Sequence, residues 1–249
     1  MFGLEFPPIE HLVVWRQFWF PGFNKVALIC VLSAIFTLLL FAIAARGDLV
    51  PKGVQNLVEA AVDFVRNDIV LQVMGPDGLP FLPILVSMFF FIFFCNIFEV
   101  IPIFQFPASA RMAIPLSLAI LTYVLYLGVG MVKMGPIKYL KESTIPPGVP
   151  KAMLPLIMLI DFLQIVAIRP FSLMVRLFAN MLAGHLLLTT FAVLSAALFS
   201  KTLLVVILPF SVAMLIALTG FEILVAVLQA FIFTILTAVY LDSSMHVSH

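Results

Sequence analysis

The sequence predicts an all-α polytopic membrane protein, and three observations carry this prediction. The 249 residues are 64% hydrophobic and only 10% charged, and their mean hydropathy is +1.24. Soluble domains contain nearer ~45–50% apolar residues. The apolar residues form runs long enough to cross a bilayer, and the last two runs are about twice the length of one crossing. A net charge of +1 gives no reason to expect a nucleic acid partner.

Three runs have the ~20 apolar residues that one crossing requires. They cover residues 26–45, 79–104 and 112–132. Residues 1–24 contain acidic residues and prolines but no basic segment ahead of an apolar one, so we expect an external arm and no cleavable signal. Residues 25–249 are expected to form a single membrane domain.

Residues 51–72, between the first two runs, have a different pattern. Apolar residues recur at helical spacing from Val54 through Leu57 and Val58 to Ile69, opposite a polar face that includes Glu59. This pattern predicts an amphipathic helix that lies at the membrane surface.

The last two runs, residues 152–200 and 202–241, are interrupted only by Ser200 and Lys201. A helix of such length would be ~60–70 Å long, against a hydrocarbon core of ~30 Å. Each run is therefore a pair of re-entrant helices or one helix tilted by ~60°, beyond the usual range. The prolines in these runs are isolated and lack a loop-type cluster, which favours a long tilted hairpin. The expected total is five membrane-embedded helices.

The orientation follows from the distribution of basic residues. The connections 46–79 and 133–151 hold seven Lys and Arg residues, whereas the opposite side holds four. The positive-inside rule then places the N-terminus outside and the C-terminus in the cytoplasm. No connection is long enough for a soluble catalytic domain, and no Walker A, zinc-protease or serine-hydrolase motif is present, so we expect no bond-making chemistry, cofactor or metal site in this chain.

Arg176 lies in the middle of the apolar run from residue 170 to 200. An arginine at membrane depth costs from ~3 to ~10 kcal/mol, so it must have a partner or a task. Its guanidinium group keeps its proton, which makes it a permanent positive charge that controls the ionisation of any nearby carboxylate. Ser172, Arg176, Asn180 and Gly184 follow one another at intervals of four and form a stripe on one helix face.

Glu222, Ala226 and Gln229 form a second stripe on the last helix. In a hairpin of two antiparallel helices, two residues that lie level with each other, one on each helix, have residue numbers that add up to a constant value. One register, with its turn near residue 203, places Arg176 level with Gln229 and His185 level with Glu222. A turn near residue 200 would instead allow a structural salt bridge between Arg176 and Glu222. His185 and Glu222 could equally form a buried pair of structural use only.

In the first register no carboxylate of this chain is level with Arg176, so its counter-charge is expected from a second protein. His185 and Glu222 can both titrate near neutral pH and are candidates for passing protons. Asn96, Glu99 and Asp161 are further polar residues at membrane depth, although a solvated site explains Asp161 equally well.

Residues 169–185 (RPFSLMVRLFANMLAGH) and 228–240 (LQAFIFTILTAVY) closely resemble subunit a of the F-type ATP synthase membrane sector. The core pattern R-L-F-x-N-x-x-A-G is highly specific, and the resemblance extends over nearly the whole chain from the first apolar run onward. Many bacterial members carry Glu at the position of His185 and His at the position of Glu222. The exchange keeps one acid and one imidazole, but it leaves the order of proton transfer open.

This resemblance implies a stator subunit in a bacterial plasma membrane, or alternatively in a mitochondrial inner membrane. Its implied partners are the ring of c subunits, the b subunits of the peripheral stalk and, indirectly, the F1 sector. Arg176 would be the essential stator arginine, with Asn180 and Gln229 as polar neighbours. His185 and Glu222 would belong to the external proton half-channel. Proton or sodium specificity depends on the ring and is not readable from this chain.

Two other classes of function remain open at this point. A self-contained channel or secondary transporter could use Arg176 to bind an anionic solute, and it would move that solute when reconstituted alone. A purely structural scaffold is disfavoured, because costly polar groups are concentrated in the last two helices.

Overall fold

The computed structural model describes residues 24–44, 53–101, 104, 106–144, 153–198 and 206–246. All regular structure in these ranges is helical, as predicted. Two segments are π-helical, η1 and η4, and two are short 3-10 helices, η2 and η3. In chain order the elements are α2 (Lys25–Ala44), α3 (Val54–Phe64), η1 (Val65–Leu71), η2 (Gly75–Phe81), α4 (Leu82–Ile97), η3 (Ala108–Ala110), α5 (Ala113–Met134), α6 (Pro136–Thr144), α7 (Leu154–Leu163), η4 (Gln164–Ile168), α8 (Arg169–Leu198) and α9 (Leu208–Met245).

Five helical stretches are long and apolar enough to cross a membrane, which confirms the predicted membrane class. They are Lys25–Ala42, Gly75–Ile97, Ala113–Met134, Leu154–Leu198 and Leu208–Met245. The second stretch ends at Ile97, earlier than the expected residue 104. There the backbone tightens into a turn, in which the Glu99 N–H donates to the Asn96 carbonyl at 3.1 Å. The residues of this turn are mostly apolar because the turn is buried in the protein. The hydropathy of the sequence therefore does not show where the helix ends.

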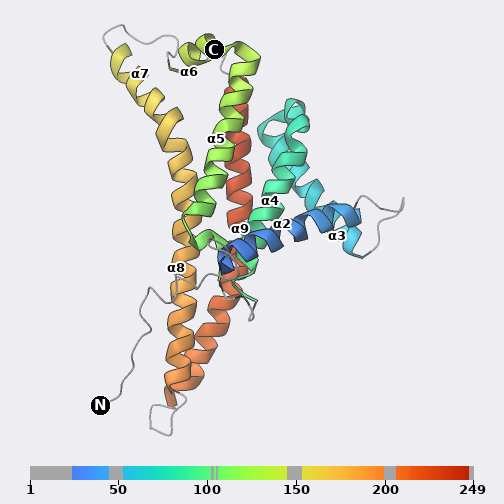
Figure 1. Ribbon diagram of the computed structural model, residues 1–249, viewed down its shortest axis with the longest axis vertical. Helices are drawn as coiled ribbons and strands as arrows, with labels where there is room; N and C mark the ends of the chain where they lie inside the picture. Colours follow the sequence, from blue (N-terminus) through green and yellow to red (C-terminus); the bar gives the residue numbers. More distant parts are fainter. Residues whose placement is uncertain are drawn as a thin grey trace.

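The chain from Leu154 to Leu198 is one helical rod of 45 residues and not two re-entrant helices. Figure 1 shows α7 leaning away from the axis of α8, and the bend lies at the π-helical segment η4. α9 continues to Met245, beyond the expected end at residue 241, and carries the polar residues Asp242 and Ser243 as part of the helix. The predicted long hairpin is therefore formed by α8 and α9.

α2 lies across the long axis of this hairpin, whereas α4 and α5 run beside it (Figure 1). With 20 residues, α2 has the length of one direct crossing, ~30 Å. When α2 stands upright in a bilayer, a hairpin that crosses it must be strongly inclined. The tilt of the hairpin relative to a membrane stays a prediction.

The expected amphipathic helix 51–72 corresponds to α3 and η1 together. Val58, Val65 and Ile69 are fully buried, whereas Leu57, expected on the same apolar face, is 68% exposed. Leu57 lies at the edge of the apolar face, because it is one position away from the buried Val58, and its side chain therefore points away from the packed side of the helix. The location of this helix at a membrane surface stays a prediction.

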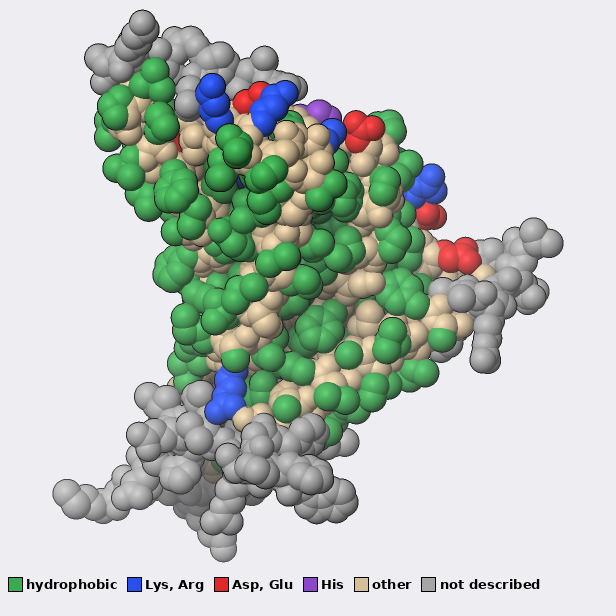
Figure 2. Space-filling view, turned by 45° about the horizontal axis from the view of Figure 1, so that its top comes forward, with side chains coloured by type: hydrophobic (Ala, Val, Ile, Leu, Met, Phe, Trp, Pro, Cys, Tyr) green, Lys and Arg blue, Asp and Glu red, His purple; other side chains and the backbone are tan. Residues whose placement is uncertain are grey.

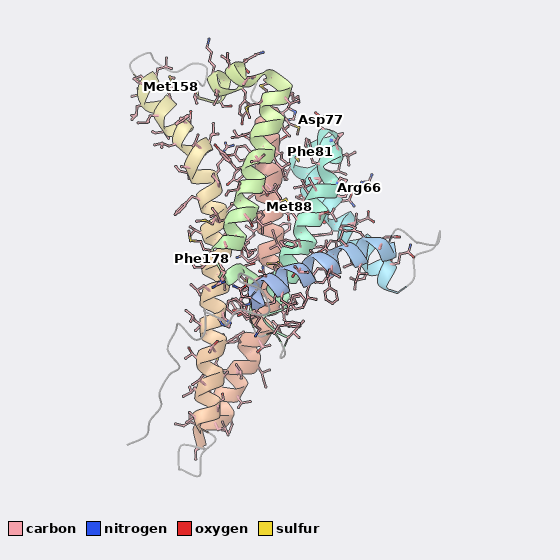
Figure 3. All side chains as sticks on the ribbon, viewed as in Figure 1. Arg66, Asp77, Phe81, Met88, Met158 and Phe178 are labelled. Carbon is pink, nitrogen blue, oxygen red and sulfur yellow. The ribbon has the colours of Figure 1, made fainter. Side chains whose placement is uncertain are left out.

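α9 is the centre of the packing, because it contacts α4, α5 and α8, while α2 packs on α4. Hydrophobic side chains cover most of the face in Figure 2, and charged side chains gather near its upper edge. The labelled residues in Figure 3 place Asp77 of η2 toward that end and Phe178 on the part of α8 nearer to α7. The C-terminal end of α9 meets η2 there, since His246 Nε2 lies 3.6 Å from Asp77 Oδ2.

Candidate functional site

Arg176 projects from α8, about two turns after the start of the helix, at the edge of the packed helices. It is half-buried, and its neighbours Ala179, Asn180 and Ala183 are exposed. The other side of α8 faces the core, where Leu173, Leu177 and Met181 are buried. Ser172, Arg176 and Asn180 therefore border an open helix face that is lined by small residues.

Two contacts define the register of the α8–α9 hairpin. Ser195 Oγ lies 2.8 Å from Ser211 Oγ, and the Glu222 carboxyl group packs against Gly184. The residue numbers of each pair add up to 406, between the values of 405 and 407 expected for the register with its turn near residue 203. The turn itself, residues 199–205, lies outside the described residues. The alternative register, with a turn near residue 200, is wrong.

None of the ion pairs found in the described ranges includes Arg176. Glu222, the partner in the alternative salt bridge, is buried at Gly184 instead. Gln229, expected level with Arg176, is buried with 3% of its surface exposed. Asp161 is half-buried in α7, and it also takes part in none of these ion pairs.

His185 is the centre of a second group of polar residues, two to three turns along α8 from Arg176. Its Nδ1 atom lies 3.5 Å from Glu99 Oε1, and its ring contacts the ring of Phe106 edge-on, with 5.0 Å between the centroids. The suggested pair of His185 with Glu222 is therefore wrong, because the acidic partner of His185 is Glu99. Successive residues of a helix point in different directions, which explains why His185 does not meet Glu222. Gly184 faces α9 and Glu222, whereas His185, one position later, faces the turn after α4.

Asn96 extends this group by one helical turn of α4. The Ser109 hydroxyl donates to Asn96 Oδ1 at 2.6 Å, and both residues are fully buried. Ser109 lies in the short helix η3, where Ala108 and Ala110 are also buried, and Phe106 is buried two residues before this helix. Sequence reasoning missed Ser109 and Phe106, because small and apolar residues between two crossings give no sign that the connection folds inward.

Three side-chain atoms in this region are buried without a hydrogen bond among the described residues: Asn96 Nδ2, Glu222 Oε2 and Glu99 Oε1, whose contact with His185 Nδ1 at 3.5 Å is an ion pair without hydrogen-bond geometry. Buried polar atoms almost always have a protein or water partner. Unpaired donors and acceptors in one region can hold water and pass protons along it. We call Asn96, Glu99, His185 and Glu222 the external cluster.

Arg169, at the start of α8, is anchored to α9. Its guanidinium carbon lies 5.2 Å from the centre of the Tyr240 ring, and its Nη2 atom donates to Ser243 Oγ at 3.4 Å. A polar cavity of about 200 Å³ adjoins it and is lined by Glu142, Ser143 and Asp242 among others. This cavity lies at the end of the molecule that carries α6 and the end of α9.

The sequence profile described as ATP synthase A chain matches residues 26–242. The chain belongs to this family. It is 40% identical to the ATP synthase subunit a of Rhodococcus erythropolis over 227 residues, which cover 90% of this chain and 82% of the relative. It is also 40% identical to the ATP synthase subunit a of Frankia alni, and this alignment covers 89% of this chain and 77% of the relative. It is 36% identical to the ATP synthase subunit a of Streptomyces lividans over an alignment of 258 residues, which covers 99% of this chain and 90% of the relative. As a member of the ATP synthase subunit a family with five spanning helices, the chain is a membrane protein.

Proposed function

We propose that this chain is the stator subunit of a proton-translocating F-type ATP synthase, in which it provides two proton half-channels and the arginine that faces the c-ring. The carrying observation is Arg176, a half-buried charge in a spanning helix that has no ion pair within the described ranges and borders a face of small residues. Small residues let another helix approach closely. The partner is then a helix that bears a carboxylate.

The external cluster forms the entry path in this proposal. Protons pass Asn96, Glu99, His185 and Glu222 and neutralise a carboxylate of the c-ring, which then turns through lipid. The unpaired buried atoms of the cluster support this role, because a proton path needs sites that accept and release protons through water. Imidazole and carboxyl groups can do so near neutral pH, whereas amides only hydrogen-bond.

Arg176 separates the two half-channels. When a protonated ring site reaches it, the fixed positive charge favours loss of the proton, because an opposite charge nearby stabilises a carboxylate. Asn180 and Gln229 act as its polar neighbours. One charge crossing 100 mV supplies ~2.3 kcal/mol, so several protons are required for each ATP.

The exit path leads to the cytoplasm on the side of α6 and the C-terminal end of α9. Asp161 and the polar cavity beside Arg169 are the groups available there. This proposal places the N-terminus outside a bacterial plasma membrane and the C-terminus in the cytoplasm. The b subunits of the peripheral stalk then hold the chain to the F1 sector, and the chain itself carries no catalytic chemistry.

ATP-driven proton pumping by the whole complex in vesicles tests the proposal. Arg176→Ala is expected to abolish pumping, with the complex present in normal amount. Arg66→Ala is the matched control, because Arg66 is an exposed arginine of η1, outside both the external cluster and the stripe of α8 that contains Arg176. This variant is expected to keep normal pumping. Normal pumping by Arg176→Ala would overturn the assignment. The chain reconstituted alone should move no ion or anionic solute, and movement of an anion by the chain alone would favour a transporter.

A further inference from the structure

The π-helical segment η4 (Gln164–Ile168) joins α7 to α8 and leaves one backbone carbonyl without its normal donor. In an α-helix the carbonyl of Ile165 would accept from the N–H of Arg169, four residues later. Here the Arg169 N–H donates to the Gln164 carbonyl, five residues back. The next residue, Pro170, has no N–H to offer. Neither the α-helical nor the π-helical donor is therefore available to Ile165.

Tyr126 of α5 supplies the missing donor. Its hydroxyl group donates to the Ile165 carbonyl oxygen at 2.5 Å, and the tyrosine is fully buried. In the apolar interior of a membrane protein no solvent is available to satisfy such a carbonyl, so breaks in a helix persist only where a neighbouring helix pairs the freed group. The bond from Tyr126 thus stabilises the π-helical turn.

The π-helical turn determines how α8 is rotated relative to α7. A single π turn accommodates one extra residue, which corresponds to a rotation of roughly 100° and a shift of ~1.5 Å between the two sides of the turn. Tyr126 holds this turn at Ile165, and Tyr240 and Ser243 hold the next turn at Arg169. Arg176 follows Arg169 by seven residues, almost two full turns, and so points in nearly the same direction.

We propose that Tyr126 is a positioning residue for Arg176, which acts by satisfying the Ile165 carbonyl and so fixing the π-helical turn from which α8 starts. The inference rests on the proposed function, since it concerns where the stator charge points. Tyr126 contacts neither Arg176 nor the external cluster in the interactions found among the described residues. Its effect passes through the helix backbone.

Tyr126→Phe removes the donor and keeps the ring. We expect proton pumping per assembled complex to fall about tenfold, because an unpaired Ile165 carbonyl lowers the population of the correctly formed π-helical turn by about that factor. Tyr123→Phe is the matched control: Tyr123 lies one turn earlier on α5, packs on the Tyr126 ring at 5.6 Å between centroids, and its hydroxyl forms none of the hydrogen bonds found in the described ranges. It should leave pumping unchanged.

A second substitution separates positioning from general damage to the fold. Pro170→Ala restores an N–H at the position from which a π-helical bond to the Ile165 carbonyl can form. Tyr126→Phe with Pro170→Ala should therefore recover most of the pumping lost in Tyr126→Phe, while Pro170→Ala alone stays near normal. Equal losses with and without Pro170→Ala would overturn the proposal, as would normal pumping by Tyr126→Phe.

Disulfide formation between cysteines at positions 176 and 229, in a background without Cys30 and Cys95, provides a readout independent of activity. Its yield per assembled chain should fall in Tyr126→Phe and return with Pro170→Ala. An unchanged yield in Tyr126→Phe would show that α8 is not rotated and would overturn the proposal. Arg176→Ala, measured in parallel, distinguishes the two hypotheses. Normal pumping there contradicts the proposed function, whereas loss there with normal Tyr126→Phe contradicts only this inference.

Discussion

The carboxyl group of Glu222 packs so closely on the backbone of Gly184 that a methyl group at position 184 would lie 2.6 Å from Glu222 Oε2. Only glycine leaves room for a buried carboxyl group between α8 and α9 at this level. The contact holds an acid of α9 beside His185 of α8 without a direct bond between the two. It thereby places the Glu222 carboxyl group of the external cluster at the hairpin interface.

Gly184→Ala should displace the Glu222 carboxyl group. The carboxyl group is the end of a flexible side chain and can move aside at small cost, so we expect slower ATP-driven proton pumping by a complex of near-normal heat stability. Gly220→Ala is the matched control, because nothing lies within 4 Å of a methyl group at that position. Equal behaviour of the two variants would show that Glu222 can move without consequence.

Arg176→Lys should still impair coupled transport, by about tenfold or more. Lysine keeps the positive charge but loses the planar group that can pair with a carboxylate through two parallel hydrogen bonds. The measurement is ATP synthesis driven by an imposed proton gradient in vesicles. Wild-type rates in Arg176→Lys would mean that a point charge is sufficient.

Disulfide crosslinking in membranes tests the hairpin register. In a background without Cys30 and Cys95, cysteines at positions 195 and 211 should crosslink readily, because the serine hydroxyls there are 2.8 Å apart. Cysteines at 176 and 229 should also crosslink, since they belong to the same register. Crosslinking of 176 to 222 in preference to 229 would contradict it.

Substitution of His185 and Glu222, two of the three titratable groups of the external cluster, tests the entry path. His185→Asn with Glu222→Gln keeps shape and hydrogen bonding but removes the ability to bind and release protons near neutral pH. We expect normal assembly and slow ATP synthesis. Full activity, measured as proton flux in vesicles, would show that the external path runs elsewhere.

The exchange His185→Glu with Glu222→His should restore part of that rate. It keeps one acid and one imidazole, but it sets a second carboxylate beside Glu99, which lies 3.5 Å from His185. Like charges at that distance disfavour ionisation of one of them. Glu99→Gln in the exchanged chain should then raise the rate further, and no change would show that Glu99 does not couple to position 185.

Hydropathy and spacing were sufficient for the class of the protein and for its unusual last two helices. The long, mainly apolar run without a loop-type cluster favoured one long helix over two re-entrant helices, and the structure contains a helical stretch of 45 residues there. The sequence also indicated two candidate registers for the hairpin, and the contacts of Ser195 with Ser211 and of Gly184 with Glu222 in the structure decided for the turn near residue 203. The class of the protein and its long helices depend on local periodicity and length, which a sequence states directly.

The partner of His185 and the role of Tyr126 were decided by tertiary packing. Glu99 is 86 positions away from His185 in the chain, and its approach depends on an inward fold of the connection around Ser109 that no periodicity indicates. The bond from Tyr126 to Ile165 likewise depends on a π-helical turn, which changes the helix phase by one residue. A sequence determines which faces of a helix are apolar, but the directions in which polar side chains meet depend on how several helices pack together at once.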